Sequence, residues 1–236
     1  MKAVWITLIL AVVASPALQA TIVFETEADL GGSGLGNVST VLTQASPAAD
    51  SDSSGCVYWD GSATQTGAAN CPAGATFGGD ELAINSTFTI GSLGVLDFAD
   101  FRIAYNSDEP QNLDGVTLEE LVFFIQAPSG ALLYSDILGA PVVHSQTQNG
   151  IGNSAFLYML NDPASANAFL ADPANVLGLA AKVSSETGGP ETFFFGIVGA
   201  TLPPGPPAAG EIPEPSTALL MALGCGLLLF GRLKQR

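Results

Sequence analysis

Short segments of the chain alternate apolar and polar residues, which is the period of a β-strand with one buried face. The alternation is clearest at residues 81–90 and 95–105. Residues 21–26, 38–45 and 155–160 are rich in β-branched and aromatic side chains, which strands favour. Turn-forming residues separate such segments at intervals of about 8–15 residues, a spacing typical of antiparallel β-sandwiches and jelly-roll-like domains. We therefore expect a mainly β domain of this kind.

Two β-hairpins are expected in the second half of the chain. Residues 116–126 mix helix-favouring and strand-favouring side chains, but a Pro-Ser-Gly turn at 127–130 and a short apolar partner at 131–134 favour a hairpin. A second hairpin is predicted from residues 176–184 and 191–200, because a Thr-Gly-Gly-Pro sequence separates them.

Local signals also predict one short helix, one bulge and one long loop. Asp162 can cap a helix and Pro163 suits its first position, so a helix is expected to run through Leu170. Gly196 interrupts an apolar strand and suggests a β-bulge. Residues 46–80 are poor in large apolar side chains and rich in Gly, Ala, Ser and Thr, so they are expected to form a loop.

Two of the three cysteines fall inside this expected loop. Cys225 lies in an apolar segment near the C-terminus, whereas Cys56 and Cys71 are 15 residues apart in the loop. A disulfide between them is predicted for an oxidising compartment, and it would pin the loop down. Two thiols and a single distant histidine are a poor zinc site.

An aromatic pair follows the first of these cysteines. Tyr58 and Trp59 would form a stacking platform for a sugar ring if the pinned loop exposes them. The alternative is a core tryptophan whose indole N–H is satisfied within the protein.

The N-terminus has the organisation of a secretory signal peptide. Lys2 precedes an apolar core at residues 3–13, and small residues, Ala17 and Ala20, end the segment. We therefore expect residues 1–20 to direct the chain through the Sec translocon and to be removed. Residues 21–200 would then be the exported domain.

The C-terminus carries a second set of signals. Residues 201–212 are Pro-rich and read as a stiff linker. Pro213, Glu214, Pro215 and Ser216 follow, and the two prolines favour an extended backbone.

An uncharged segment at residues 217–231 comes next and ends before three basic residues, Arg232, Lys234 and Arg236. As a transmembrane helix it would be only roughly 20–25 Å long, short of the roughly 30 Å hydrocarbon core. The basic residues would snorkel to the interface and remain in the cytoplasm.

This order of parts resembles the PEP-CTERM sorting signal of Gram-negative bacteria, a region also catalogued as an ice-binding-protein C-terminal domain. The resemblance covers residues 213–236 and leaves the central domain unassigned. It implies recognition by exosortase, a membrane-embedded cysteine protease, with cleavage near Pro213-Glu214-Pro215-Ser216. The helix would then be a transient anchor in the inner membrane, and the product would go to the cell surface or the extracellular matrix. A plain membrane anchor without processing is the alternative.

The net charge of the chain argues against anionic partners. All 22 acidic residues of the 236-residue chain lie between residues 21 and 215, where Arg102 and Lys182 are the only bases, so this part carries a net charge of −20. Such a surface repels nucleic acid and anionic lipid.

The sequence offers little material for catalysis. His144 is the only histidine, no nucleophile elbow accompanies it, and an ordinary surface position is expected for it. Carboxylate pairs such as Asp97 with Asp100, or Glu119 with Glu120, could in principle run glycoside hydrolysis. A solvated surface role is the simpler explanation, because acidic residues are abundant throughout the domain.

Calcium is the one cofactor that the sequence suggests. Asp108 and Asp114 lie in the turn-rich stretch 106–115, and Asp50 and Asp52 lie in another loop, which is where Ca²⁺ finds oxygen ligands. Neither stretch matches an EF-hand, and ordinary turn chemistry also explains these residues.

Taken together, these features predict a non-enzymatic surface or matrix protein with a structural or adhesive role in exopolysaccharide or biofilm. A carbohydrate-binding module and a secreted glycan hydrolase are the alternatives, with extracellular polysaccharide as the expected partner of the former.

Overall fold

The computed structural model describes residues 21–29, 39–45, 51–67, 70–72, 77, 79–107, 115–145, 154–186 and 189–198. The chain divides into two units, residues 1–200 and 201–236, and all described residues belong to the first. The predicted signal peptide, linker, sorting motif, 217–231 helix and basic tail therefore lie outside the described residues, as do Asp108 and Asp114.

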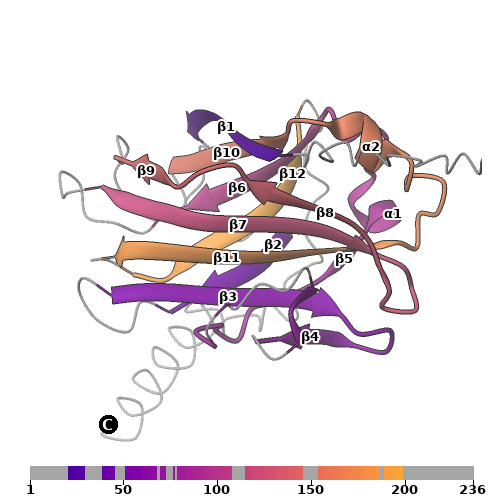
Figure 1. The fold of residues 1–236 in the computed structure, drawn as a ribbon, viewed down its shortest axis with the longest axis horizontal. Helices are drawn as coiled ribbons and strands as arrows, with labels where there is room; N and C mark the ends of the chain where they lie inside the picture. Colours follow the sequence, from indigo (N-terminus) through magenta and orange to yellow (C-terminus); the bar gives the residue numbers. More distant parts are fainter. Residues whose placement is uncertain are drawn as a thin grey trace, which may run out of the picture. The chain divides into compact units, whose positions relative to one another are not determined.

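The described unit is mainly β, as predicted (Figure 1). Its strands are β1 (Thr21–Asp29), β2 (Ser39–Gln44), β3 (Ser51–Trp59), β4 (Thr64–Thr66), β5 (Phe88–Thr89), β6 (Phe101–Asn106), β7 (Val116–Gln126), β8 (Leu132–Leu138), β9 (Val142–His144), β10 (Ser154–Leu160), β11 (Val176–Glu186) and β12 (Glu191–Ile197). The helices are α1 (Ile90–Leu93) and α2 (Pro163–Asn167). In this part of the chain neither helix is long and apolar enough to cross a membrane.

The strands form one curled sheet rather than two separate ones. The order is β2-β12-β6-β10-β1-β8-β7-β11-β3-β4, with β5 paired to β11 and β9 to β7. All pairs are antiparallel except β1 with β8, where Thr21 and Ile22 run parallel to Ile137 and Leu138. The sheet is therefore mixed, and the expectation of a purely antiparallel one is wrong at this pair.

The curl lets one half of the sheet pack against the other around aromatic side chains. Phe123 on β7 lies 5.2 Å from Phe101 on β6 and 5.9 Å from Phe195 on β12, measured between ring centroids. Phe98 completes this group at 5.3 Å from Phe101. All four rings are fully buried, so this aromatic group is the centre of the main hydrophobic core.

Residues 80–86 join two strands that the sheet order puts far apart. On the β2 side, Ala45, Leu82 and Ser86 take part in backbone hydrogen bonds that link this segment to β2 and its end. On the β3 side, the Ser54 N–H donates to Asp80 Oδ2 at 3.0 Å and the Cys56 N–H donates to Glu81 Oε1 at 2.8 Å. These carboxylates occupy the edge of β3 where no strand pairs with it.

A buried side chain reinforces the same closure. The Gln44 Nε2 amide on β2 donates to the Ala181 carbonyl on β11 at 2.8 Å, and the Ser53 hydroxyl on β3 donates to Gln44 Oε1 at 3.0 Å. Three strands that are not all neighbours in the sheet are thus connected through one amide.

Several predicted elements are confirmed. β1, β2 and β10 lie where strands were expected, and β7 forms a hairpin with β8. Asp162 caps α2 by accepting from the Ser165 N–H, and Pro163 is the first helical residue. The helix ends at Asn167, three residues earlier than predicted.

Other predictions are wrong, and each error has a physical reason. Residues 46–80 contain β3 and β4. A small residue suits β3, where a Cβ on Gly55 would lie 2.9 Å from the Leu42 side chain, and β4 pairs with β3 at the end of the sheet. Residues 81–90 contribute only the two residues of β5 and an isolated bridge at Glu81, since most of the segment is held to β2 by scattered hydrogen bonds. Likewise residues 95–105 are in turns until β6 begins at Phe101.

The predicted second hairpin is also wrong. β11 pairs with β3, β5 and β7, whereas β12 pairs with β2 and β6, so these strands follow one another in sequence without pairing. No register shift occurs at Gly196; the irregularity in β12 falls between Phe193 and Phe194, opposite β2.

Gly178 on β11 is a position where packing leaves no room for a side chain. A Cβ there would collide with the Phe124 ring and lie 2.6 Å from the Val57 carbonyl oxygen. We expect Gly178→Ala to lower the free energy of unfolding by about 2–3 kcal/mol, as overpacking does, measured by urea denaturation.

Gly196→Ala is the matched control, because a Cβ at this strand glycine would meet nothing within 4 Å. It should change stability by less than about 1 kcal/mol. Equal effects of the two substitutions would show that the close approach at Gly178 is not limiting.

Candidate functional site

Two hairpin turns pack against each other at one end of the sheet. One joins β3 to β4 and the other joins β7 to β8 (Figure 1). Gly61 and Gly130 lie in these turns with φ of +98° and +86°, and a Cβ on Gly61 would fall 2.5 Å from the Ser129 carbonyl oxygen. A Cβ on Gly130 would fall 2.6 Å from the Asp60 carbonyl oxygen. Glycine is therefore required both by the left-handed backbone and by the contact between the turns.

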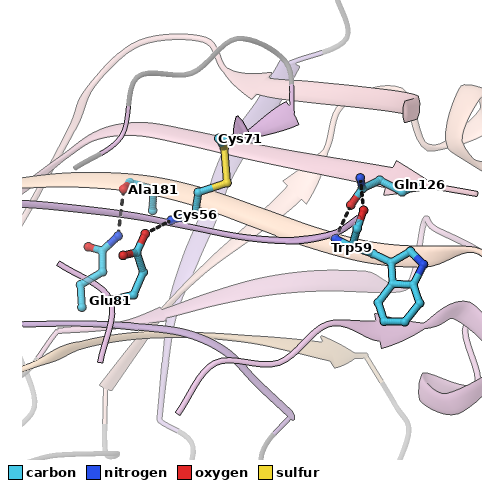
Figure 2. The surroundings of a disulfide bond; sticks show 7 residues. Cys56, Trp59, Cys71, Glu81, Gln126 and Ala181 are labelled. Atoms are coloured by element: carbon cyan, nitrogen blue, oxygen red, sulfur yellow. Dashed lines mark hydrogen bonds between the residues drawn. A yellow bond between two sulfur atoms is a disulfide. The ribbon is translucent and has the colours of Figure 1, made fainter. Parts of the chain in front are cut away.

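Gln126, the last residue of β7, holds the turns together. Its Oε1 accepts from the Trp59 N–H and its Nε2 donates to the Trp59 carbonyl, both at 2.8 Å (Figure 2). The same Nε2 donates to the Gly130 carbonyl at 3.1 Å. The side chain is only 2% exposed, so this amide takes the place of a neighbouring strand for the end of β3.

The side chains of Trp59 and Asp60 are also held by hydrogen bonds. The Trp59 indole N–H donates to the Pro128 carbonyl at 2.8 Å. Asp60 Oδ1 accepts from the backbone N–H groups of Ser62 and Ala63, and its Oδ2 accepts from Gln65. The two backbone donors are the largest reasons why the pKa of Asp60 lies below its ordinary value, so a carboxylate is held in place on this turn.

The predicted disulfide is present beside this site. Cys56 on β3 is bonded to Cys71, with their Cα atoms 6.1 Å apart (Figure 2). It lies in a small hydrophobic cluster on the opposite face of the sheet from the main core. The cluster consists of Cys56, Tyr58, Cys71, Phe77, Val122, Phe124 and Ala180. The bond therefore holds the chain near Cys71 against the outside of β3.

A pocket of about 280 Å³ opens where the two turns and the disulfide-held segment meet. Its lining residues are Tyr58, Trp59, Asp60, Asn70, Pro72, Gln126, Gly130 and Leu132. The lining combines aromatic surface with one carboxylate and two amides. Such a mixture binds small polar ligands that also have an apolar face, and this pocket is the candidate functional site.

The structure brings the predicted aromatic pair to this pocket but gives its members different roles. Tyr58 is almost fully buried in the cluster around the disulfide, whereas Trp59 is half-buried. Both lie on β3 rather than on a loop. The aromatic surface offered to a ligand is therefore mainly that of Trp59. Gln126, Asn70 and Leu132 were not found from the sequence; the only signal was a polar residue ending the apolar strand β7.

A surface position was expected for His144, and this prediction is wrong. It is buried on β9, where its ring stacks on Phe156 at 3.9 Å between centroids and its Nε2 is hydrogen-bonded to the Tyr158 hydroxyl. Burial lowers its pKa to about 4, opposed by the nearby charge of Glu27. The ring is a neutral part of the core at neutral pH.

The carboxylates considered for hydrolysis have structural contacts. Asp97 Oδ1 accepts from the Ala99 N–H and from Asn167 Nδ2, both at 2.8 Å, and these bonds lower its pKa. Glu119 Oε1 accepts from the Ser184 hydroxyl at 2.6 Å. Asp100 and Glu120 are exposed.

For metal binding, the described residues contain no cluster of three or more His, Cys, Asp or Glu side chains suited to hold an ion. The predicted calcium ligands Asp108 and Asp114 are not among these residues, and neither is Asp50.

A buried carboxyl that the sequence did not suggest lies on β8. Asp136 is 2% exposed; its Oδ1 accepts from the Ile137 N–H at 2.9 Å and its Oδ2 faces the Tyr134 hydroxyl at 3.4 Å. Burial raises its pKa to about 6, with a smaller contribution from the negative charge of Asp162.

Comparison with family models, with curated proteins and with solved structures finds no match to this chain.

The disulfide closes a loop of 15 residues, which the chain-entropy account values at about 3 kcal/mol. Reducing the protein should lower its free energy of unfolding by about that amount, measured by urea denaturation with and without a thiol reductant. A Cys56→Ala, Cys71→Ala double variant is the control and should be insensitive to the reductant. Equal stability of the oxidised and reduced native protein would contradict the prediction.

Asp136 should make stability depend on pH. The pKa of Asp136 is about 6 in the folded protein, above its value in the unfolded chain. Its contribution to the free energy of unfolding is therefore fully present below about pH 4 and is lost as pH rises through 6. His144 acts in the opposite direction, because its lowered pKa makes protonation costly as pH falls from about 6.5 through 4.

Comparing Asp136→Asn with the native protein isolates the first of these effects. Between pH 4 and pH 7 the variant should gain stability relative to the native protein, by at most about 3 kcal/mol. Chemical denaturation at several pH values measures this gain. Parallel stability curves for the two proteins would show that Asp136 keeps its ordinary titration in the fold.

Proposed function

We propose that the chain is an exported surface or extracellular-matrix protein with a structural or adhesive, non-enzymatic role. In this proposal the Sec translocon carries it across the inner membrane of a Gram-negative bacterium. The 217–231 helix holds it there briefly, and exosortase releases it by cutting near Pro213-Glu214-Pro215-Ser216.

The observation that carries the proposal is the combination of two end signals with a disulfide-bonded domain between them. A signal-peptide pattern opens the sequence, and the Pro-Glu-Pro motif, short apolar segment and basic tail close it. The Cys56–Cys71 disulfide supports export independently, because such bonds persist in oxidising compartments and are rare in the cytosol.

The architecture also supports an extracellular location. We propose that the curled sheet is a jelly-roll-like sandwich whose two halves are joined through β1 and β8. The carboxylates of Asp80 and Glu81 occupy part of the edge of β3, and covered edges oppose unwanted pairing between strands of different molecules. The net charge of −20 in residues 21–215 favours solubility and disfavours nucleic-acid partners.

Carbohydrate binding is the second candidate, and one observation favours it: the pocket that contains Trp59 combines an aromatic ring with fixed polar groups. It would explain how an adhesive protein is retained in a polysaccharide matrix. A glycan hydrolase is supported less well, because Asp97 and Glu119 are engaged in hydrogen bonds within the fold.

Deleting Pro213-Glu214-Pro215 should block processing, because the extended segment that exosortase is proposed to cut is removed. We expect a full-length protein retained in the inner membrane, detected by membrane fractionation and by the intact mass of the protein. Deleting three residues of the linker, 206–208, is the control for chain length and should leave release unchanged. Normal size and surface delivery of the first variant would defeat the sorting proposal.

A further inference from the structure

We propose that the pocket between the two clasped turns binds one ring of a neutral carbohydrate, with the flat face of the sugar stacked on Trp59. The inference names a ligand class for the adhesive role proposed above and rests on that role only for its biological setting. The geometry itself is a property of the folded domain.

The first part of the argument is that Trp59 is held ready for a ligand. Gln126 bonds both backbone polar groups of this residue, and Pro128 accepts from its indole N–H. The ring is therefore fixed at its backbone and at its only polar atom, while part of its surface remains exposed. The ring still offers apolar surface to a ligand. Because the side chain is already ordered, little conformational entropy is lost when a ligand covers it.

The second part is the polar rim. Asp60 presents a carboxylate that the turn holds in one orientation, and Asn70 adds an exposed amide from the segment next to Cys71. Sugar hydroxyls donate to carboxylates and exchange hydrogen bonds with amides. A pyranose is a ligand with this combination of an apolar face and a ring of hydroxyls.

The third part is size. A volume of about 280 Å³ lies at the lower limit of ligand pockets. It suits a single ring, with the rest of a polysaccharide chain continuing outside.

Charge then selects among sugars. The two basic residues of the exported domain are Arg102 and Lys182, and both face carboxylates elsewhere, those of Glu25 and Asp52. Neither lines the pocket. A uronic acid would bring its carboxylate close to Asp60 without a counter-charge, and the resulting repulsion disfavours it. The ligand class is therefore neutral.

Trp59 fluorescence gives a direct test. The chain has two tryptophans, Trp5 and Trp59, so Trp5→Phe in the full-length, detergent-solubilised protein leaves the pocket residue as the only reporter. Tetrasaccharides of β-1,4-linked glucose and of N-acetylglucosamine are titrated against tetragalacturonate of the same length. We expect a saturable change in fluorescence with at least one neutral tetrasaccharide and at least roughly fivefold weaker binding of the uronate.

Variants in the same Trp5→Phe background separate stacking from charge. Because Trp59→Ala removes the reporter, binding is measured for all variants by calorimetry. Trp59→Ala should weaken neutral binding roughly tenfold or more, Asp60→Asn should reduce the discrimination against tetragalacturonate, and Leu96→Ala, which changes an exposed apolar side chain outside the lining, should change neither. Circular dichroism verifies folding, and Trp59→Phe replaces Trp59→Ala if the latter does not fold.

The proposal is overturned if no neutral tetrasaccharide binds, if folded Trp59 variants bind as the parent does, or if the uronate binds as tightly as the neutral sugars. Because purified protein is used, these results do not depend on sorting. A failed sorting experiment would leave the pocket proposal standing, and the reverse is equally true.

Discussion

Closure of the curled sheet depends on hydrogen bonds made by residues 80–86, which connect β2 with β3. The two strands lie near opposite ends of the sheet order, and without this connection the aromatic core around Phe123 would be open along one side. Backbone groups serve the β2 side, while the carboxylates of Asp80 and Glu81 serve the β3 side. Charge-assisted bonds of this kind are stronger than neutral ones, so two side chains replace part of a missing strand. The disulfide holds the outer surface of β3 at the same level of the sheet.

At the pocket, too, a side chain takes the place of a neighbouring strand. Gln126 bonds both backbone groups of Trp59, as a neighbouring strand would, and this positions the indole and the turn that carries Asp60. The candidate site is therefore a consequence of how the end of β3 is paired. Closure of the sheet and the position of the pocket have the same basis: amide and carboxylate side chains complete the hydrogen bonding of β3 where no neighbouring strand pairs with it.

Local patterns in the sequence were sufficient to predict a mainly β domain and the elements stabilised by their neighbours in sequence. The β7–β8 hairpin and the cap at Asp162 are of this type. Pairing between distant segments was not predictable, because small residues in β3 carry no apolar alternation and because β11 and β12 look like a hairpin yet pair elsewhere. At the site, the aromatic pair and the disulfide were visible in the sequence. Gln126 and Asn70 were not, since their roles arise only when distant turns meet.

The position of β1 has a consequence for how this chain acquires its structure. The strand lies in the interior of the sheet between β8 and β10, and its partners reach Leu160. A segment made first is thus completed by segments made much later, and the contact order of the domain is high, which slows folding. A polypeptide that emerges from its N-terminus onward cannot form this sheet until more than a hundred further residues have followed.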